Sequence, residues 1–172
     1  IGRSDLLRQR HTGGTADKTD LTRLLAHIDN GAAPRWNGTL HPQVENATDS
    51  LIIDITRKTL AAHNKVDLIM PIANTNRSVG AMLSGYIATH DTYRHLPDDT
   101  IAVTFKGSAG QSFGAFLHQG ITLRLEGDAN DYLGKGLSGG HIIVTPPKES
   151  TFDPAENIIA GNTLLYGATA GE

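Results

Sequence analysis

The residue patterns that could carry chemistry lie in the glycine-rich second half of this chain. Residues 134–139, Gly-Lys-Gly-Leu-Ser-Gly, match the G-x-G-x-x-G loop that holds a dinucleotide pyrophosphate. That loop needs a strand before it and a helix opening at its end, so that the helix N-terminus meets the phosphates. Residues 141–145, His-Ile-Ile-Val-Thr, follow instead and are typical of a strand. The pattern therefore predicts no nucleotide site here.

The serine-nucleophile pattern G-x-S-x-G occurs twice, around Ser112 and around Ser138. A nucleophile elbow needs a helix directly after the serine, and neither copy precedes an expected helix. The sequence also contains no cysteine, which excludes thiolate nucleophiles, disulfides, cysteine-ligated zinc and iron–sulfur clusters. We therefore predict no catalytic residue and no cofactor-binding residue in this chain.

Oxygen atoms that could bind a metal gather at Asp128, Asn130 and Asp131. Calcium prefers such ligands, but the distal glutamate of an EF-hand loop is absent, and Asx-type turns at a corner of the chain are the simpler explanation. We predict no metal ligand. A metal site that uses these three residues, or His141, is the alternative hypothesis.

The glycines of these patterns belong to a repeat of twenty residues. Residues 101–120 and 121–140 are identical at six of twenty positions, and a short fixed period indicates structural units that stack. Each unit begins with the alternation of a half-buried strand and continues into a glycine-rich return. The repeat predicts a mainly β fold, a parallel β-helix with coils of about 20 residues. The expected structural repeat positions are Gly107, Gly114, Gly120, Gly127, Gly134, Gly136 and Gly140.

The stacking of the coils leads to further predictions about neighbouring residues. Lys106 should lie beside Glu126 on the outer face of a parallel ladder. A third coil starts at His141, which would fall on the apolar face in strict register, so we expect this strand to be offset by one residue. Residues 148–156 are expected to be an insertion.

The first part of the chain has a different character. Residues 1–65 are expected to form an N-terminal arm with two short helices, at 20–29 and at 50–64. Thr48 or Asp49 is expected to cap the second helix. This arm would act as a linker to whatever precedes the repeats.

The remainder, residues 66–172, is expected to form the glycine-repeat domain. It should contain a strand at 66–72 and one helix at about 79–90. Trp36 is expected to anchor the arm onto the core of this domain, and a platform for a ligand is the alternative.

The composition narrows the class of protein. A net charge of −3 and a pI near 6.2 provide no basic field for nucleic acid. No apolar run approaches the ~20 residues of a transmembrane helix. The chain begins at Ile1, without a methionine or a signal peptide, which suggests a piece of a longer protein. The lack of disulfides fits a cytoplasmic location.

Longer segments of the chain resemble one family. Residues 107–116 and 127–140 closely resemble the C-terminal domain of the glutamate synthase large subunit, named for the G-x-G-x-G pattern that residues 134–136 show here. Other segments that resemble it are residues 1–7, 74–80 and 161–169, so the likeness covers the whole chain. One of the subunits of formylmethanofuran dehydrogenase is a looser relative, which shares the glycine coils alone.

The resemblance implies a right-handed β-helix inside a large cytoplasmic oxidoreductase that acts on CH–NH2 donors. This enzyme family forms L-glutamate from L-glutamine and 2-oxoglutarate with reduced pyridine nucleotide or ferredoxin. It uses an N-terminal cysteine amidotransferase domain, an FMN barrel with an iron–sulfur cluster, and a smaller reductase subunit. Because this chain has no cysteine, the nucleophile and the cluster ligands would lie outside it.

For this chain itself the resemblance implies a structural role that connects the catalytic domains, with a C-terminus truncated at Glu172. The alternative hypothesis is a stand-alone β-helix scaffold or a metal-binding protein. A third hypothesis is a homo-oligomer, which would form through the open edge of the last coil.

Overall fold

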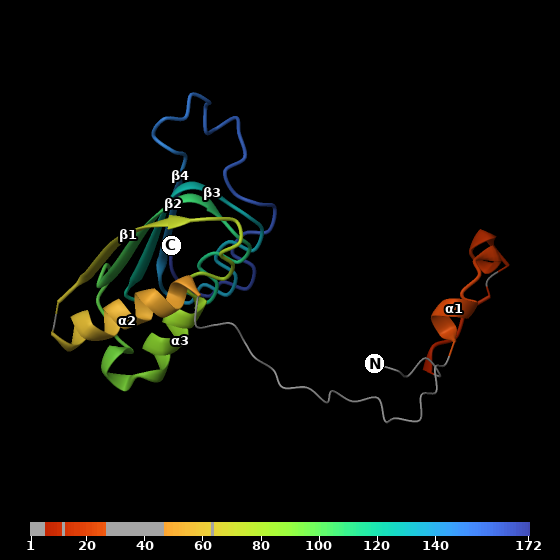
Figure 1. Cartoon of the computed structure of the whole chain (residues 1–172), viewed down its shortest axis with the longest axis horizontal. Coiled ribbons are helices and arrows are strands. Elements are labelled where there is room, and N and C mark those ends of the chain that lie inside the picture. The colour runs from red at the N-terminus through yellow and green to blue at the C-terminus, as the bar shows by residue number, and fades with distance from the viewer. Residues whose placement is uncertain (1–5, 12, 27–46, 63) are drawn as a thin grey trace. The chain divides into compact units, whose positions relative to one another are not determined.

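The structure is a computed structural model, and it describes residues 6–11, 13–26, 47–62 and 64–172 (Figure 1). The chain divides into two units, Ile1–His41 and Pro42–Glu172. The division predicted at residue 65 stays a prediction. None of the helices in the described part has the length and apolar character that a membrane crossing requires.

The described part of the first unit contains two short helical turns. They are the 3-10 helix η2 (Thr15–Lys18) and the α-helix α1 (Thr22–Leu25). Asp20 Oδ1 accepts a hydrogen bond from the N–H of Thr22 at 2.9 Å, and the extended residue Ala26 ends α1. This helix is therefore shorter than the one predicted at 20–29, of which residues 27–29 lie outside the described residues. Trp36 lies outside the described residues, so its anchoring role stays a prediction.

A parallel sheet forms the centre of the second unit (Figure 1). Its four strands lie in the order β1-β2-β3-β4, and they are β1 (Val66–Ile72), β2 (Ile101–Ala109), β3 (Ile121–Ala129) and β4 (His141–Thr145). Alternate side chains of each strand face the core, as the period of two in the sequence predicts. In β2 these are Ile101, Val103 and Phe105, all fully buried.

The register of the sheet follows the repeat in the sequence. Ile101 pairs with Ile121, and each later residue of β2 pairs with the residue twenty positions further on. The predicted neighbours Lys106 and Glu126 are confirmed, because Lys106 Nζ lies 3.2 Å from Glu126 Oε2. This pair is partly exposed, so its contribution to stability is small.

The fourth strand is offset by one residue, as predicted. His141 pairs with Thr122, and the next residue, Ile142, pairs with Leu123. Because side chains alternate across a strand, this offset places Ile142 on the core side and His141 on the outer side. A strict twenty-residue register would have buried an imidazole among aliphatic side chains.

Two helices lie side by side next to the sheet (orange and green in Figure 1). They are α2 (Thr48–Ala61) and α3 (Ala81–Thr89), and the short η3 (Asp91–Tyr93) follows. Both helices bury apolar side chains in the same core as the strands, namely Ile52, Leu60, Leu83 and Ile87. The helix predicted at 79–90 is confirmed, and the helix predicted at 50–64 begins and ends slightly earlier.

The predicted fold class, a mainly β right-handed parallel β-helix, is wrong, because the second unit is a small α/β domain. Each repeat contributes one strand, and the strands join a single four-stranded sheet. The glycine-rich halves of the repeats form turns that meet through isolated bridges such as Leu133–Leu164. Helices α2 and α3 supply apolar surface that completes the core. The period of the repeat gives the spacing of the strands, but it carries no information about helices upstream of it.

Three glycine-rich segments, residues 110–120, 130–140 and 160–171, lie next to one another and are joined by backbone hydrogen bonds. Gly134 N–H donates to Phe113 O at 2.9 Å, and Leu165 N–H donates to Leu133 O at 2.8 Å. Between β4 and the last of these segments the chain projects from the domain (blue, top of Figure 1). The predicted insertion at 148–156 falls in this projection.

Candidate functional site

A carboxylate from α2 holds the N-terminus of α3. Asp49 accepts hydrogen bonds from the N–H groups of Gly80 at 2.8 and 3.0 Å, Met82 at 2.8 Å and Leu83 at 3.2 Å. A helix leaves such donors unpaired at its start, and its dipole favours a negative charge there. Asp49 therefore caps a helix other than its own. The local cap that the sequence predicts at Thr48 or Asp49 is not formed, since α2 begins at Thr48 without a side-chain cap.

Burial raises the pKa of the Asp49 carboxyl above its usual range. The hydrogen bonds from Gly80, Leu83 and Met82 oppose this effect, because they favour the charged form, but burial is the larger influence. Shifted carboxyl groups occur at catalytic sites and also in structural networks. Both Asp49 oxygens accept hydrogen bonds from the backbone of α3, so the geometry favours the structural interpretation.

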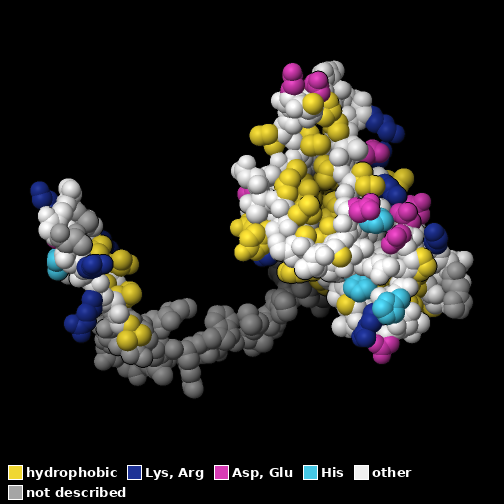
Figure 2. Space-filling model, turned by 180° about the vertical axis from the view of Figure 1, so that it is seen from behind, with side chains coloured by type: hydrophobic (Ala, Val, Ile, Leu, Met, Phe, Trp, Pro, Cys, Tyr) yellow, Lys and Arg dark blue, Asp and Glu magenta, His cyan; other side chains and the backbone are white. Residues whose placement is uncertain are grey.

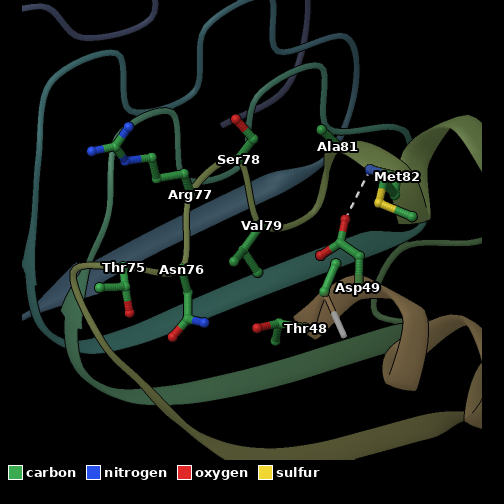
Figure 3. A pocket seen from close by; sticks show the side chains of 10 residues that line it. Thr48, Asp49, Thr75, Asn76, Arg77, Ser78, Val79, Ala81 and Met82 are labelled. Carbon is green, nitrogen blue, oxygen red and sulfur yellow. Dashed lines mark hydrogen bonds between the residues drawn. The ribbon is translucent and has the colours of Figure 1, made fainter. Parts of the chain in front are cut away.

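A pocket of about 320 Å³ lies beside this carboxylate (Figure 3). In Figure 3 the side chain of Arg77 and the hydroxyl of Ser78 point away from Asp49, whereas Met82 lies next to it. The described residues that line the pocket therefore offer hydroxyl and amide groups, and among them no cation faces the carboxylate. Its lining residues are Ala47, Thr48, Asp49, Thr75, Asn76, Arg77, Ser78, Val79, Ala81 and Met82.

The loop between β1 and α3 also pairs with the first glycine-rich segment. Ser78 N–H donates to Gln111 O at 2.8 Å, and Gly114 N–H donates to Val79 O at 2.8 Å. Since the next residue, Gly80, binds Asp49, one hydrogen-bonded path connects α2, the start of α3 and the glycine-rich turns. The site is thus a structural junction between helices and repeats.

The predicted repeat glycines lie where a side chain would collide with neighbouring chain. A Cβ added to Gly107 would overlap the carbonyl oxygen of Ile72, and one added to Gly127 would overlap the carbonyl oxygen of Gly107. Strands of the sheet thus come too close at this row for any residue but glycine. The other predicted glycines, each near a neighbouring side chain, are Gly114, Gly120, Gly134, Gly136 and Gly140. Their structural role stays a prediction, which these contacts support.

The patterns that resemble catalytic motifs lie in the glycine-rich turns. Strand β4 begins at His141, two positions after the last residue of the G-x-G-x-x-G pattern, so no helix N-terminus is presented to a phosphate. Ser112 lies in a turn, and the Ser138 hydroxyl donates to Leu117 O at 3.2 Å. Neither serine precedes a helix. That the chain has no catalytic or cofactor-binding residue stays a prediction.

The predicted polar cluster makes hydrogen bonds with the protein. Asp128 Oδ1 accepts from the Ser108 hydroxyl at 2.6 Å, and Asp131 Oδ1 accepts from Asn162 N–H at 2.8 Å. Asn130 Nδ2 donates to Asn74 Oδ1 and to Ala109 O. Within the described ranges, no group of three or more His, Asp or Glu side chains could hold a metal ion. The contacts therefore favour turns over a metal site, and His141 is not brought to this cluster by its place on β4.

A family model relates this chain to the GXGXG motif, and the similar proteins relate it to glutamate synthases. Residues 49–172 match the GXGXG motif family. The chain is 42% identical over 99% of its length to glutamate synthase [NADH] of Saccharomyces cerevisiae, and 42% identical over its full length to the glutamate synthase [NADPH] large chain of Azospirillum brasilense. It is 48% identical over 73% of its length to the ferredoxin-dependent glutamate synthase of Cyanidium caldarium.

The chain spans only 8% of the yeast protein, 12% of the Azospirillum protein and 8% of the Cyanidium protein. The family model, on the other hand, matches most of this chain. Its match begins at Asp49, the residue that caps α3, and includes the whole sheet and all three glycine-rich segments. This chain belongs to the GXGXG motif family.

Proposed function

We propose that this chain is the non-catalytic GXGXG domain of a glutamate synthase large chain. The parent enzyme would be an oxidoreductase that forms L-glutamate from L-glutamine and 2-oxoglutarate. The observation that carries the proposal is the similarity along 99% or more of this chain to two glutamate synthases, of which it fills only a small share. A segment of that kind is a part of an enzyme, and the chemistry would be carried by other parts.

The structural role is supported by the way the conspicuous polar groups are used. The buried carboxylate of Asp49 is bound by backbone N–H groups of α3, and the acidic residues Asp128 and Asp131 bind neighbouring turns. The glycines at 107 and 127 make room for carbonyl oxygens of adjacent strands. Asp49 also lines the pocket of about 320 Å³, but both of its oxygens are bound by backbone N–H groups of α3, which supports a structural use of this carboxylate.

The partners in this proposal are the amidotransferase and FMN-barrel domains of the same polypeptide and a reductase subunit, in the cytoplasm. The three relatives are named for different electron donors, NADH, NADPH and ferredoxin. This chain is nevertheless similarly close to the matching region of each, at 42%, 42% and 48% identity. We infer that this domain does not select the electron donor. Residues 1–65 would link it to the barrel side of the enzyme.

A chimera tests the proposal. The region of the Azospirillum large chain that matches this chain is replaced by residues 1–172, and glutamate formation from glutamine and 2-oxoglutarate is measured. We expect activity close to that of the parent, and loss of activity when the same chimera carries Gly127→Val. A chimera that is intact and folded but forms no glutamate would contradict the proposal. Turnover by the 172-residue chain alone would contradict its non-catalytic role.

A further inference from the structure

Large apolar side chains face solvent across the three glycine-rich segments. Phe116, Tyr132, Leu165 and Tyr166 are 56%, 39%, 51% and 65% exposed, and we call this set the aromatic surface. Figure 2 shows one face of the second unit, and hydrophobic side chains gather in a broad area on this face. Phe116 packs over Gly136, whose N–H donates to Tyr166 O at 2.9 Å, and Leu165 N–H donates to the O of Leu133, the residue after Tyr132, at 2.8 Å. These contacts place the four residues on adjacent turns.

Three of these four residues have a strained backbone. The φ angles of Phe116, Tyr132 and Leu165 are 57°, 63° and 53°, in the left-handed region that residues with a Cβ rarely adopt. Glycine would fit there without strain, and the repeat uses it, since Gly136 stands twenty residues after Phe116 with a φ of 64°. Strained positions that carry bulky exposed side chains indicate a use for those side chains outside the domain.

The charge within the surface indicates the chemistry of its partner. Lys135 Nζ lies 5.5 Å from the centre of the Tyr132 ring, and none of the ion pairs formed by the described residues includes it. Aromatic residues are enriched at the centre of protein interfaces, whereas lysine is depleted there, so a lysine beside exposed rings constrains what can cover them. An ammonium group covered by a partner needs a carboxylate opposite it.

We propose that the aromatic surface docks another part of the large chain, one that presents aliphatic side chains and a carboxylate opposite Lys135. This inference rests on the proposed function, which supplies the remainder of the polypeptide as the occupant. A second copy of this chain is the competing occupant. The two differ in where the surface is covered, since a second copy would cover it in the isolated chain as well.

Hydroxyl-radical footprinting tests the surface, because the radical oxidises exposed aromatic rings. Oxidation rates are compared between the 172-residue chain and the Azospirillum chimera. We expect the rates at Phe116, Tyr132 and Tyr166 to fall about fivefold in the chimera, as exposed rings become the core of an interface. Phe152, an exposed ring in the projecting segment, is the matched control and should keep its rate. Equal rates at the three rings in both proteins would overturn the proposal.

The activity of the chimera reports on the proposed function, whereas its footprint reports on the surface whether or not the chimera is active. Slow oxidation of the three rings in the isolated chain, together with a dimer mass in sedimentation, would overturn the proposal in favour of a second copy. Phe116→Gly adds a test of opposite signs. We expect it to raise the melting temperature of the isolated chain, because strain is removed, and to restore fast oxidation of Tyr166 in the chimera.

Discussion

Removal of the Asp49 carboxylate should destabilise this domain far more than removal of an ordinary surface acid. In Asp49→Ala the N–H groups of Gly80, Met82 and Leu83 lose the acceptor that they share. Loss of a cap costs about 0.5–2 kcal/mol and each buried unpaired donor about 1–3 kcal/mol, but water in the adjacent pocket can satisfy some donors. We therefore expect a loss of about 2–4 kcal/mol in the free energy of unfolding.

Urea denaturation of the 172-residue chain measures this loss, with an unchanged m value as the sign that the transition is still the same. Asp54 is the matched control, because it lies on the same helix and pairs with Arg57 on the surface at 2.9 Å. Asp54→Ala should cost less than about 0.5 kcal/mol, as exposed pairs three residues apart do. The reasoning is refuted if Asp49→Ala and Asp54→Ala give the same stability.

The pH dependence of stability follows from the raised pKa of Asp49. A carboxyl whose pKa is higher in the folded than in the unfolded chain binds protons more readily when folded, so its contribution is present at low pH and is lost as pH rises through the folded pKa. Compared with Asp49→Asn, which does not titrate, the wild type should gain stability as pH falls from neutral toward the usual carboxyl range. If the difference in unfolding free energy between wild type and Asp49→Asn stays constant over this pH range, burial does not raise the pKa of the Asp49 carboxyl.

Three further outcomes are expected. Gly127→Ala should cost at least about 3 kcal/mol in thermal or urea unfolding, because its Cβ would overlap Gly107 O. Gly85→Ala, at an open position of α3, should instead stabilise the domain by about 0.5–1 kcal/mol. Equal effects of the two substitutions would contradict the steric account. A double-mutant cycle on Lys106 and Glu126 should give a coupling of about 0.2–1 kcal/mol that weakens with salt, and a coupling unchanged in high salt would argue against an exposed pair. Addition of calcium, magnesium or zinc should leave the melting temperature unchanged, because Asp128 and Asp131 already bind the protein, and a concentration-dependent rise would revive the metal hypothesis.

The strands of this domain could be predicted from the sequence because their signal is local. The alternation at 101–105 and at 121–125 gives the buried side of each strand, and the twenty-residue repeat gives their register. The one-residue offset of β4 could also be predicted, since a buried His141 would be unfavourable. These inferences use only the period of a strand and the cost of burying a polar group.

The fold class and the role of Asp49 could not be predicted because they depend on contacts between distant parts of the chain. Gly80 is 31 residues from Asp49, and no local pattern distinguishes an acid that caps its own helix from one that caps a later helix. The alternating pattern of β2 is the same whether its apolar side packs on helices or on further strands. The helices α2 and α3 therefore had to be placed in space before the fold class could be decided.

The lengths of the strands follow from the same row of close contacts that requires glycine. At this row Ile72, Gly107 and Gly127 lie side by side, and the two glycines allow β2 and β3 to continue to nine residues each. In β4, Thr145 pairs with Glu126, so the next residue, Pro146, comes to the row beside Gly127. Proline has no N–H to donate to a ladder, and β4 ends after five residues. The chain leaves the sheet at this point, which is why the projecting segment arises from β4 and not from the strands that carry glycine.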